Sequence, residues 1–413
     1  MSWILFILLN VLSSAYAEEA AALPGGQCLI CHQSMEDEPS TRWKDDVHAT
    51  AGIGCNECHG GDPTSDDQDI SMDPKKGFKG APKRADIPKL CAKCHSNPVF
   101  MKKYNPMLRV DQYELYLTSQ HGKKLKQGDT KVAECVSCHS VHNIRKVNDA
   151  KSPVYAVNLP TMCAHCHADP EYMKPYKIST TVYAEYAKSV HGKALLEKGD
   201  VRGAPACNDC HGNHGATPPG LKSIAHICGS CHVHNAELFL KSPMAKALQK
   251  DPYGECISCH GNHLIVHISD DRIGTQQGAI CAKCHKEGDK GAAVAMAFSK
   301  MIGSLKNYSA EASKIIEEAR DKGMDVTEAE DSMQNARQAL IQARTEIHSF
   351  SMPGVEAKIT EGRKAVDQAI ALGKAALREN KTRRVGLGIS TIFLTLLVIA
   401  LALKIRSLPP PRK

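Results

Sequence analysis

The chain has 413 residues, of which 18 are cysteine and 20 are histidine, while only 5% are aromatic. That length suggests two or three domains, but so few aromatic side chains cannot fill conventional cores, so we expect a non-protein group in the interior. The formal net charge of +7 is no sign of a nucleic-acid partner, because acidic and basic residues nearly balance over residues 18–290 and the excess lies in residues 291–413.

Residues 1–17 have the features of a secretory signal peptide. An apolar stretch runs from Trp3 to Leu12, and Ala15 and Ala17 form the small-x-small pattern of a cleavage site. Lys and Arg are absent before the apolar stretch, which leaves an uncleaved N-terminal anchor as the alternative. In either case we expect the body of the protein outside the cytoplasm.

Nine Cys-x-x-Cys-His motifs follow, and they use every cysteine of the chain. Two thiols at this spacing reach the two vinyl groups of one haem, and the adjacent His then becomes the proximal ligand of the iron. Zinc ribbons and redox disulfides also use paired cysteines, but neither requires a His directly after the second cysteine. The predicted attachment residues are Cys28, Cys31, Cys55, Cys58, Cys91, Cys94, Cys135, Cys138, Cys163, Cys166, Cys207, Cys210, Cys228, Cys231, Cys256, Cys259, Cys281 and Cys284. The predicted proximal ligands are His32, His59, His95, His139, His167, His211, His232, His260 and His285.

We therefore expect nine covalently attached haem c groups within residues 18–290. The chain provides only roughly 29 residues per motif, too few to bury a conventional core. The porphyrins themselves are expected to form the core, so that neighbouring macrocycles lie close together.

An internal repeat groups the motifs into pairs. Residues 91–142 and 163–214 each contain a motif, a Ser-x-His-Gly-Lys segment, and a second motif with a further His three residues on. Residues 28–59 and 228–263 follow the pattern in degenerate form, so the body consists of four paired-haem repeats plus one haem at Cys281.

The repeat also suggests distal ligands, because a second imidazole on each iron must come from the histidines outside the motifs. His48, His121 and His191 share the position before a second motif, and His142, His214 and His263 share the position after it. His226, His234 and His267 are further candidates, whereas His165 lies inside its own motif and is expected to be a solvated side chain. Met244 stands where the other repeats have His; packing is the expected role and thioether ligation the alternative.

The C-terminal part is expected to be helical. Three apolar stripes step by three and four residues, as in helices that pack against each other. They comprise Phe298, Met301, Leu305 and Tyr308, then Met333, Ala336, Leu340, Ala343, Ile347 and Phe350, then Val355, Ile359, Gly362, Val366, Ala369, Gly373 and Ala376. We predict an antiparallel bundle over residues 291–384, with a capping box at Thr327 and Glu330 and a turn at residues 351–354; a mere spacer is the alternative. His348, near that turn, is hypothesised to bind the haem at Cys281.

Residues 385–403 contain no charge and are long enough for one transmembrane helix. Arg383, Arg384, Lys404 and Arg406 flank this run like interfacial anchors; a buried core helix is the alternative. The flanking charges balance and give no orientation, so the signal peptide decides, and residues 404–413 become a cytoplasmic tail. The fold class expected is mainly α with much irregular loop: a haem-packed body, a helical bundle and one C-terminal membrane helix.

With these motifs, the chain resembles the membrane-anchored periplasmic multihaem c-type cytochromes of anaerobic respiration, some of which have doubled motifs like those at Cys135–Cys163 and Cys256–Cys281. The resemblance covers residues 28–285 and, more loosely, the helical tail. It implies mostly bis-His haems and electron relay between a membrane quinol-oxidising or cytochrome b subunit and soluble periplasmic cytochromes, with no catalytic residue. It also implies a location on the periplasmic side of the inner membrane, with a single C-terminal anchor in the lipid bilayer.

The alternative is an oxidoreductase that acts on a small nitrogen or sulfur compound at one open haem. Octahaem hydroxylamine oxidoreductases and pentahaem nitrite reductases are similar in motif density and in having a helical C-terminal region. This sequence lacks the Lys-containing motif typical of the latter, and its histidines are numerous enough to close all nine irons. For the relay, our hypothesis is that electrons enter at the Cys281 haem, next to the helical tail, and leave at the Cys28 end.

Overall fold

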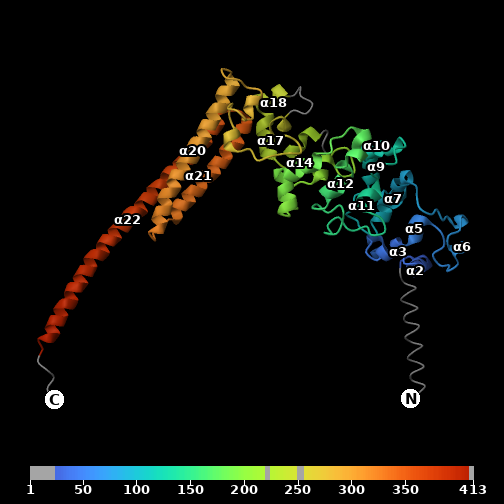
Figure 1. The fold of residues 1–413 in the computed structure, drawn as a ribbon, viewed down its shortest axis with the longest axis horizontal. Coiled ribbons are helices and arrows are strands. Elements are labelled where there is room, and N and C mark those ends of the chain that lie inside the picture. Colours follow the sequence, from blue (N-terminus) through green and yellow to red (C-terminus); the bar gives the residue numbers. More distant parts are fainter. Residues whose placement is uncertain (1–23, 219–223, 249–254, 409–413) are drawn as a thin grey trace, which may run out of the picture. The chain divides into compact units, whose positions relative to one another are not determined.

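The computed structural model describes residues 24–218, 224–248 and 255–408 (Figure 1). These residues form helices joined by irregular loops, with no strand among them, which confirms the mainly α fold class. The expected signal peptide and the last residues of the expected tail lie outside the described residues. The chain forms two compact units, residues 1–227 with 261–266 (unit 1) and residues 228–260 with 267–413 (unit 2). Unit 2 thus includes the motifs at Cys228, Cys256 and Cys281 as well as the C-terminal helices.

Unit 1 is built from short helices, none longer than nine residues among those described. They are α2 (Gly26–Ser34), α3 (Glu38–Trp43), α4 (Val47–Thr50), α5 (Cys55–His59), α6 (Gln68–Ser71), η1 (Pro74–Lys76), η2 (Arg84–Asp86), α7 (Ile87–His95), α8 (Pro98–Met101), α9 (Gln112–Thr118), α10 (Gln120–Lys126), α11 (Cys135–His139), α12 (Leu159–His167), α13 (Pro170–Met173), η3 (Lys174–Tyr176), α14 (Val182–Lys188), α15 (Val190–Gly192), the π-helical turn η4 (Lys193–Glu197), α16 (Cys207–His211) and the beginning of η5 (Ile224–Ser230).

The motif helices of unit 1 fall into two classes that follow the repeat. The first motif of each pair lies within a nine-residue helix, α2, α7 or α12, and the second motif forms a five-residue helix, α5, α11 or α16. Each five-residue helix stops at its His because the next residue, Gly60, Ser140 or Gly212, adopts a positive φ that a helix cannot contain. In unit 1 the helix of each second motif therefore ends directly at the motif His.

Apolar side chains provide little of the interior of unit 1. The cluster of buried apolar residues in its described part contains Leu159, Leu195, Ala204 and Ala206. This is far less than a conventional domain of this length buries, and it agrees with the expectation that another group fills the interior.

Unit 2 begins with short helices and continues into three long ones (Figure 1). Its elements are the rest of η5, α17 (Val233–Leu240), α18 (Pro243–Leu248), α19 (Cys256–His260), η6 (Asp270–Arg272), η7 (Cys281–Lys283), α20 (Lys290–Asp321), α21 (Thr327–Glu346), η8 (Ile347–Ser349) and α22 (Met352–Arg406). Helices α20, α21 and α22 pack side by side and confirm the predicted three-helix bundle.

The predicted apolar stripes form the core of this bundle. The buried residues of α22 are the predicted stripe from Val355 to Ala376, without exception, and Met333, Ala336, Leu340 and Ala343 are buried on α21. Small residues allow close packing of the helices: a Cβ added to Gly362 would lie 2.6 Å from Leu305 Cδ2.

Helix α22 continues from the bundle through the predicted membrane span without interruption. It is 55 residues long, and it contains a segment long and apolar enough to cross a membrane, none of which is buried within the protein. Residues 385–403 would span about 28 Å, close to the thickness of a bilayer's hydrocarbon core. The structure thus agrees with the anchor and gives no support to a buried core helix in this segment.

The predicted capping box at Thr327 is wrong. The N-cap of α21 is Val326, and the Thr327 amide and hydroxyl both donate to the Asp325 carboxylate, at 3.0 and 2.7 Å. A charged carboxylate two residues earlier is the stronger acceptor, and Glu330 instead forms an ion pair with Arg320.

An ion pair joins the loop before the ninth motif to the bundle. Arg344 on α21 donates through Nε and Nη2 to the two Asp270 carboxylate oxygens, at 2.9 and 2.8 Å. This hydrogen bonding holds the pKa of Asp270 below its usual value. The geometry is bidentate, which is the arrangement in which a surface ion pair contributes most to the stability of the fold.

We expect Asp270→Asn to lower the free energy of unfolding of unit 2 by about 1 kcal/mol at neutral pH. A lowered carboxylate pKa stabilises the fold above the unfolded-state value of about 4, and this contribution is lost as the pH falls through the folded-state pKa. The difference between wild type and variant should therefore vanish in acid. Thermal unfolding followed by circular dichroism from pH 3 to 7 measures it, with Asp331→Asn at an exposed position of α21 as control; an equal difference at all pH values would contradict the prediction.

Candidate cofactor-binding sites

Within each described pair of motifs, the first cysteines meet. Hydrogen bonds link the thiols of Cys163 and Cys207, and of Cys228 and Cys256. The second of these bonds lowers the pKa of the Cys228 thiol to about 7 and raises that of Cys256. The Cys91 thiol bonds to Cys135 in the same way, so the two attachment sites of a pair share an edge.

Successive pairs meet through the second cysteines. Cys58 is close enough to Cys91 and Cys94 to interact electrostatically, and Cys138 is similarly close to Cys166. In unit 2, Cys259 interacts with Cys281 and Cys284. The Cys28 and Cys55 thiols of the first pair also interact. The first six motifs thus form one continuous series in unit 1, and the last three form another in unit 2.

Six histidines outside the motifs lie opposite motif histidines in the described part of the chain. Their ring centroids are 5.9–6.1 Å apart. The pairs are His48 with His95, His59 with His142, His121 with His167, His139 with His214, His211 with His263, and His260 with His348.

This spacing fits an iron atom held between two imidazoles. A metal–nitrogen bond is about 2 Å long and an imidazole centre lies about 1 Å behind its nitrogen, so two axial rings are separated by about 6 Å. Rings in direct van der Waals stacking would lie closer together. The residues present therefore fit bis-His haem.

A zinc site fits the residues less well. In the described part of the chain, no group of three or more His, Cys, Asp or Glu side chains is placed to hold a metal ion. Structural zinc requires four such ligands around one point. Here the thiols of a motif face neighbouring thiols, while its His faces another imidazole.

The pairing follows two rules. A His after a second motif faces the second motif of the preceding pair: His142 faces His59, His214 faces His139, and His263 faces His211. A His before a second motif faces the first motif of the next pair, as His48 faces His95 and His121 faces His167. Imidazoles are thus exchanged between neighbouring repeats, and the second repeat supplies one to the repeat on either side of it.

The structure places His348 at a different motif from the one hypothesised. His348 lies opposite His260, with the rings 12° from parallel. The first rule explains this position: no pair follows the fourth, so no post-motif His is available to face His260, and the bundle supplies an imidazole in its place. The short helix α17 packs against η8, which contains His348.

Hydrogen bonds to Nδ1 orient several of these rings. The Nδ1 atoms of His59 and His348 lie 2.9 Å from the Gly80 and Thr345 carbonyl oxygens, and that of His48 lies 2.9 Å from Asp46 Oδ1. A carbonyl or carboxylate only accepts, so Nδ1 carries the proton and Nε2 keeps its lone pair for a metal. Burial also lowers the pKa of His95, His139 and His211, which favours the neutral, ligating form.

A tyrosine in the middle repeats orients the segment before the second motif, and the sequence analysis missed it. Tyr116 and Tyr186 each precede the candidate ligand by five residues, and their hydroxyls donate to Ala133 O and Pro205 O, at 2.9 and 2.8 Å. The glycine after the ligand position leaves room for the tyrosine carbonyl: a Cβ on Gly122 would lie 2.1 Å from Tyr116 O. The constant spacing of five residues between this tyrosine and the His of the following His-Gly pair is the sequence feature that could have revealed it.

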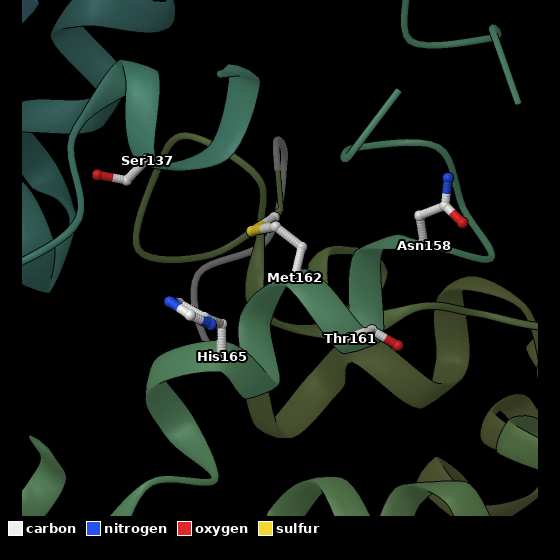
Figure 2. Close-up of a pocket in the computed structure, with 5 residues that line it drawn as sticks. All are labelled: Ser137, Asn158, Thr161, Met162 and His165. Carbon is white, nitrogen blue, oxygen red and sulfur yellow. The ribbon is translucent and has the colours of Figure 1, made fainter. Parts of the chain in front are cut away.

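The remaining candidate histidines stay predictions. His191 is half-buried on α15, His226 lies in η5, and His234 and His267 are exposed. His165, expected to be a solvated side chain, is exposed and lines an open recess of about 450 Å³ with Ser137, Asn158, Thr161 and Met162. Figure 2 shows the His165 ring beside Met162 on α12, with Ser137 opposite on α11.

Comparison with known families agrees with the motifs and the paired imidazoles. The family model of cytochrome c3 matches residues 47–168, and that of cytochrome c554 and c-prime matches residues 13–60. The chain is a multihaem c-type cytochrome. Both matches imply covalently bound haem c and point to electron transfer. The cytochrome c3 match contains three complete imidazole pairs: His48 with His95, His59 with His142, and His121 with His167.

No curated protein matches the chain. No solved structure matches it either.

Proposed function

We propose that this multihaem cytochrome binds nine haems at its nine motifs and relays electrons between a quinol-linked membrane partner and soluble periplasmic carriers in anaerobic respiration. When bound, haem c supplies one-electron redox chemistry. The protein's own residues would hold six of the irons between two imidazoles, orient several of those imidazoles, and keep the attachment sites in a continuous series within each unit.

One observation carries the proposal: the six imidazole pairs with centroids 5.9–6.1 Å apart. An iron with two protein ligands has no free position for a substrate and remains low-spin in both oxidation states. Such a site exchanges electrons with little rearrangement. The contacts between neighbouring motifs then favour transfer from one site to the next within each unit.

The expected location follows from the ends of the chain. A signal peptide over residues 1–17 would export the body, and the span at residues 385–403 would retain it at the periplasmic side of the inner membrane. Within unit 2, η7 packs against α20, so the Cys281 site adjoins the bundle that leads into the span. This supports electron entry at the Cys281 haem.

The first test is the haem count and spin state of the purified protein. We expect an intact mass equal to the mature chain plus nine haems, and optical and EPR spectra with low-spin signals alone. The matched control replaces Cys281 and Cys284 with Ser, which should remove one haem. A stoichiometric high-spin haem that binds nitrite, hydroxylamine or cyanide would contradict the relay and favour an enzyme.

The angles between the paired imidazole planes also predict the shape of the low-spin EPR signals. The imidazole planes of the second-motif pairs lie 9–26° from parallel, whereas those of His48 with His95 and His121 with His167 are 82° and 55° apart. The angle between axial planes sets the anisotropy of a ferric low-spin signal. We therefore expect two classes of EPR signal. The class from near-parallel imidazoles should be the more rhombic and should integrate to at least four haems. A single class of signal would contradict the pairing.

A further inference from the structure

Met244 occupies the same local structure as the histidines before the second motifs. In all four repeats an aromatic residue lies five positions before the ligand position, and a capping residue lies two positions before it. These residues are Trp43 and Asp46 before His48, Tyr116 and Ser119 before His121, Tyr186 and Ser189 before His191, and Phe239 and Ser242 before Met244. In each, the capping residue's amide donates to the aromatic residue's carbonyl, at 3.0, 3.0, 2.9 and 2.8 Å respectively.

The capping side chain confirms this register. Ser119 Oγ accepts from the Gly122 amide at 3.0 Å, and Ser189 Oγ accepts from the Gly192 amide at 2.9 Å. Ser242 Oγ accepts from the Ala245 amide at 3.3 Å. Met244 is therefore held between the same hydrogen bonds as the histidines, on the half-buried side of α18.

The fourth repeat has Pro243 directly before the ligand position, where the first and third repeats have Val. This difference agrees with its place as the last repeat of the chain. Val47 and Val190, directly before their ligand histidines, donate from the backbone to Ile144 O and Ile265 O, both at 2.8 Å. Each acceptor belongs to a segment behind a later second motif. The fourth repeat has no such later segment, and Pro243, which has no amide hydrogen, does not need one.

The junction between the eighth and ninth motifs repeats the junction between the second and third. Lys93 Nζ donates to Glu57 O at 3.4 Å, and Lys283 Nζ donates to Ser258 O at the same distance. In both, the second cysteine of one motif interacts with both cysteines of the next. At the earlier junction the residue before the second motif, His48, faces the His of the following motif, His95.

The proximal side of the ninth site is held by the bundle. His285 Nδ1 lies 3.1 Å from Asp289 Oδ1, and Asp289 also caps α20 by accepting from the Ala292 amide at 2.6 Å. Gly291 lies directly against the ring, since a Cβ there would be 2.1 Å from His285 Cε1. One face of the site is thus fixed by α20, and Nε2 is left to bind iron.

We propose that Met244 is the distal ligand of the haem at Cys281, which makes this site His/Met while the paired sites are bis-His. The inference rests on the proposed function, because it requires a haem at the ninth motif. A thioether ligand raises the reduction potential of a haem relative to a second imidazole. The Cys281 haem, which lies next to the bundle, therefore has the highest reduction potential of the three haems in unit 2.

The test compares Met244→Leu and Met244→His with Met296→Leu in the fully loaded protein. Met296 is a matched control, because it lies on α20 and its Sδ accepts from the Thr275 amide at 3.5 Å. Wild type and Met296→Leu should show the near-infrared charge-transfer band of thioether-ligated ferric haem. Met244→Leu should lose the band, and Met244→His should lose it while remaining wholly low-spin, with the highest-potential haem moved down to the range of the others.

Two outcomes overturn the inference, and they differ from each other. If the peptide containing Cys281 and Cys284 carries a haem and the band is absent from wild type or survives in Met244→Leu, Met244 is not the ligand and the nine-haem relay is unaffected. If mass spectrometry finds no haem on that peptide, the nine-haem proposal fails and this inference fails with it.

Discussion

Replacing His348 with Ala is expected to convert one haem, that of the Cys256 motif, from low-spin to high-spin. His348 lies opposite His260 with ring centroids 6.1 Å apart, and its Nδ1 is fixed by the Thr345 carbonyl. Alanine leaves the iron with one protein ligand, so water or an added ligand such as cyanide can bind. The haem count should stay unchanged, because the cysteines are intact. EPR and cyanide titration measure the effect.

His165→Ala is the control for this variant. His165 is expected to be a solvated side chain and is exposed, so its loss should leave every haem low-spin. A His348→Ala protein in which all haems remain low-spin would refute the pairing with His260. High-spin character at the Cys281 haem instead would restore the original hypothesis for His348.

The bundle was predicted correctly and the attachment motifs could be recognised from the sequence, because both are local patterns. The Cys-x-x-Cys-His spacing is a property of five consecutive residues, and the stripe from Val355 to Ala376 follows from a helix packed on one side. Both can be read without knowing the rest of the fold.

The ligand pairing could not be predicted in this way, because it depends on contacts between repeats. His142 and His214 share a position in the repeat, but nothing local shows that each faces the preceding pair. The same applies to His348, whose place near the corner at residues 351–354 suggested the Cys281 site. Its position opposite His260 depends on packing between distant segments, such as the contact of η8 with α17.

The error at Thr327 has a different origin. A capping box was predicted from Thr327 and Glu330, but Asp325 competes for the same donors and Arg320 competes for the Glu330 carboxylate. Such competition between neighbouring polar groups is decided by geometry at the helix end, which the pattern alone does not contain.

A chain that ends after Arg384 is expected to move almost completely from the membrane fraction to the soluble periplasmic fraction with its haems in place. The buried stripe of α22 ends at Ala376, so this truncation keeps the bundle and removes only the exposed apolar segment. Leu, Ile and Val each favour the bilayer by roughly 0.3–0.6 kcal/mol near its centre, and the segment contains many of them, so its loss shifts partitioning by orders of magnitude. A chain that ends after Arg406 retains the span and is the control, because it should stay in the membrane. Fractionation with haem staining measures both, and membrane retention of the shorter chain would show that another surface anchors the protein.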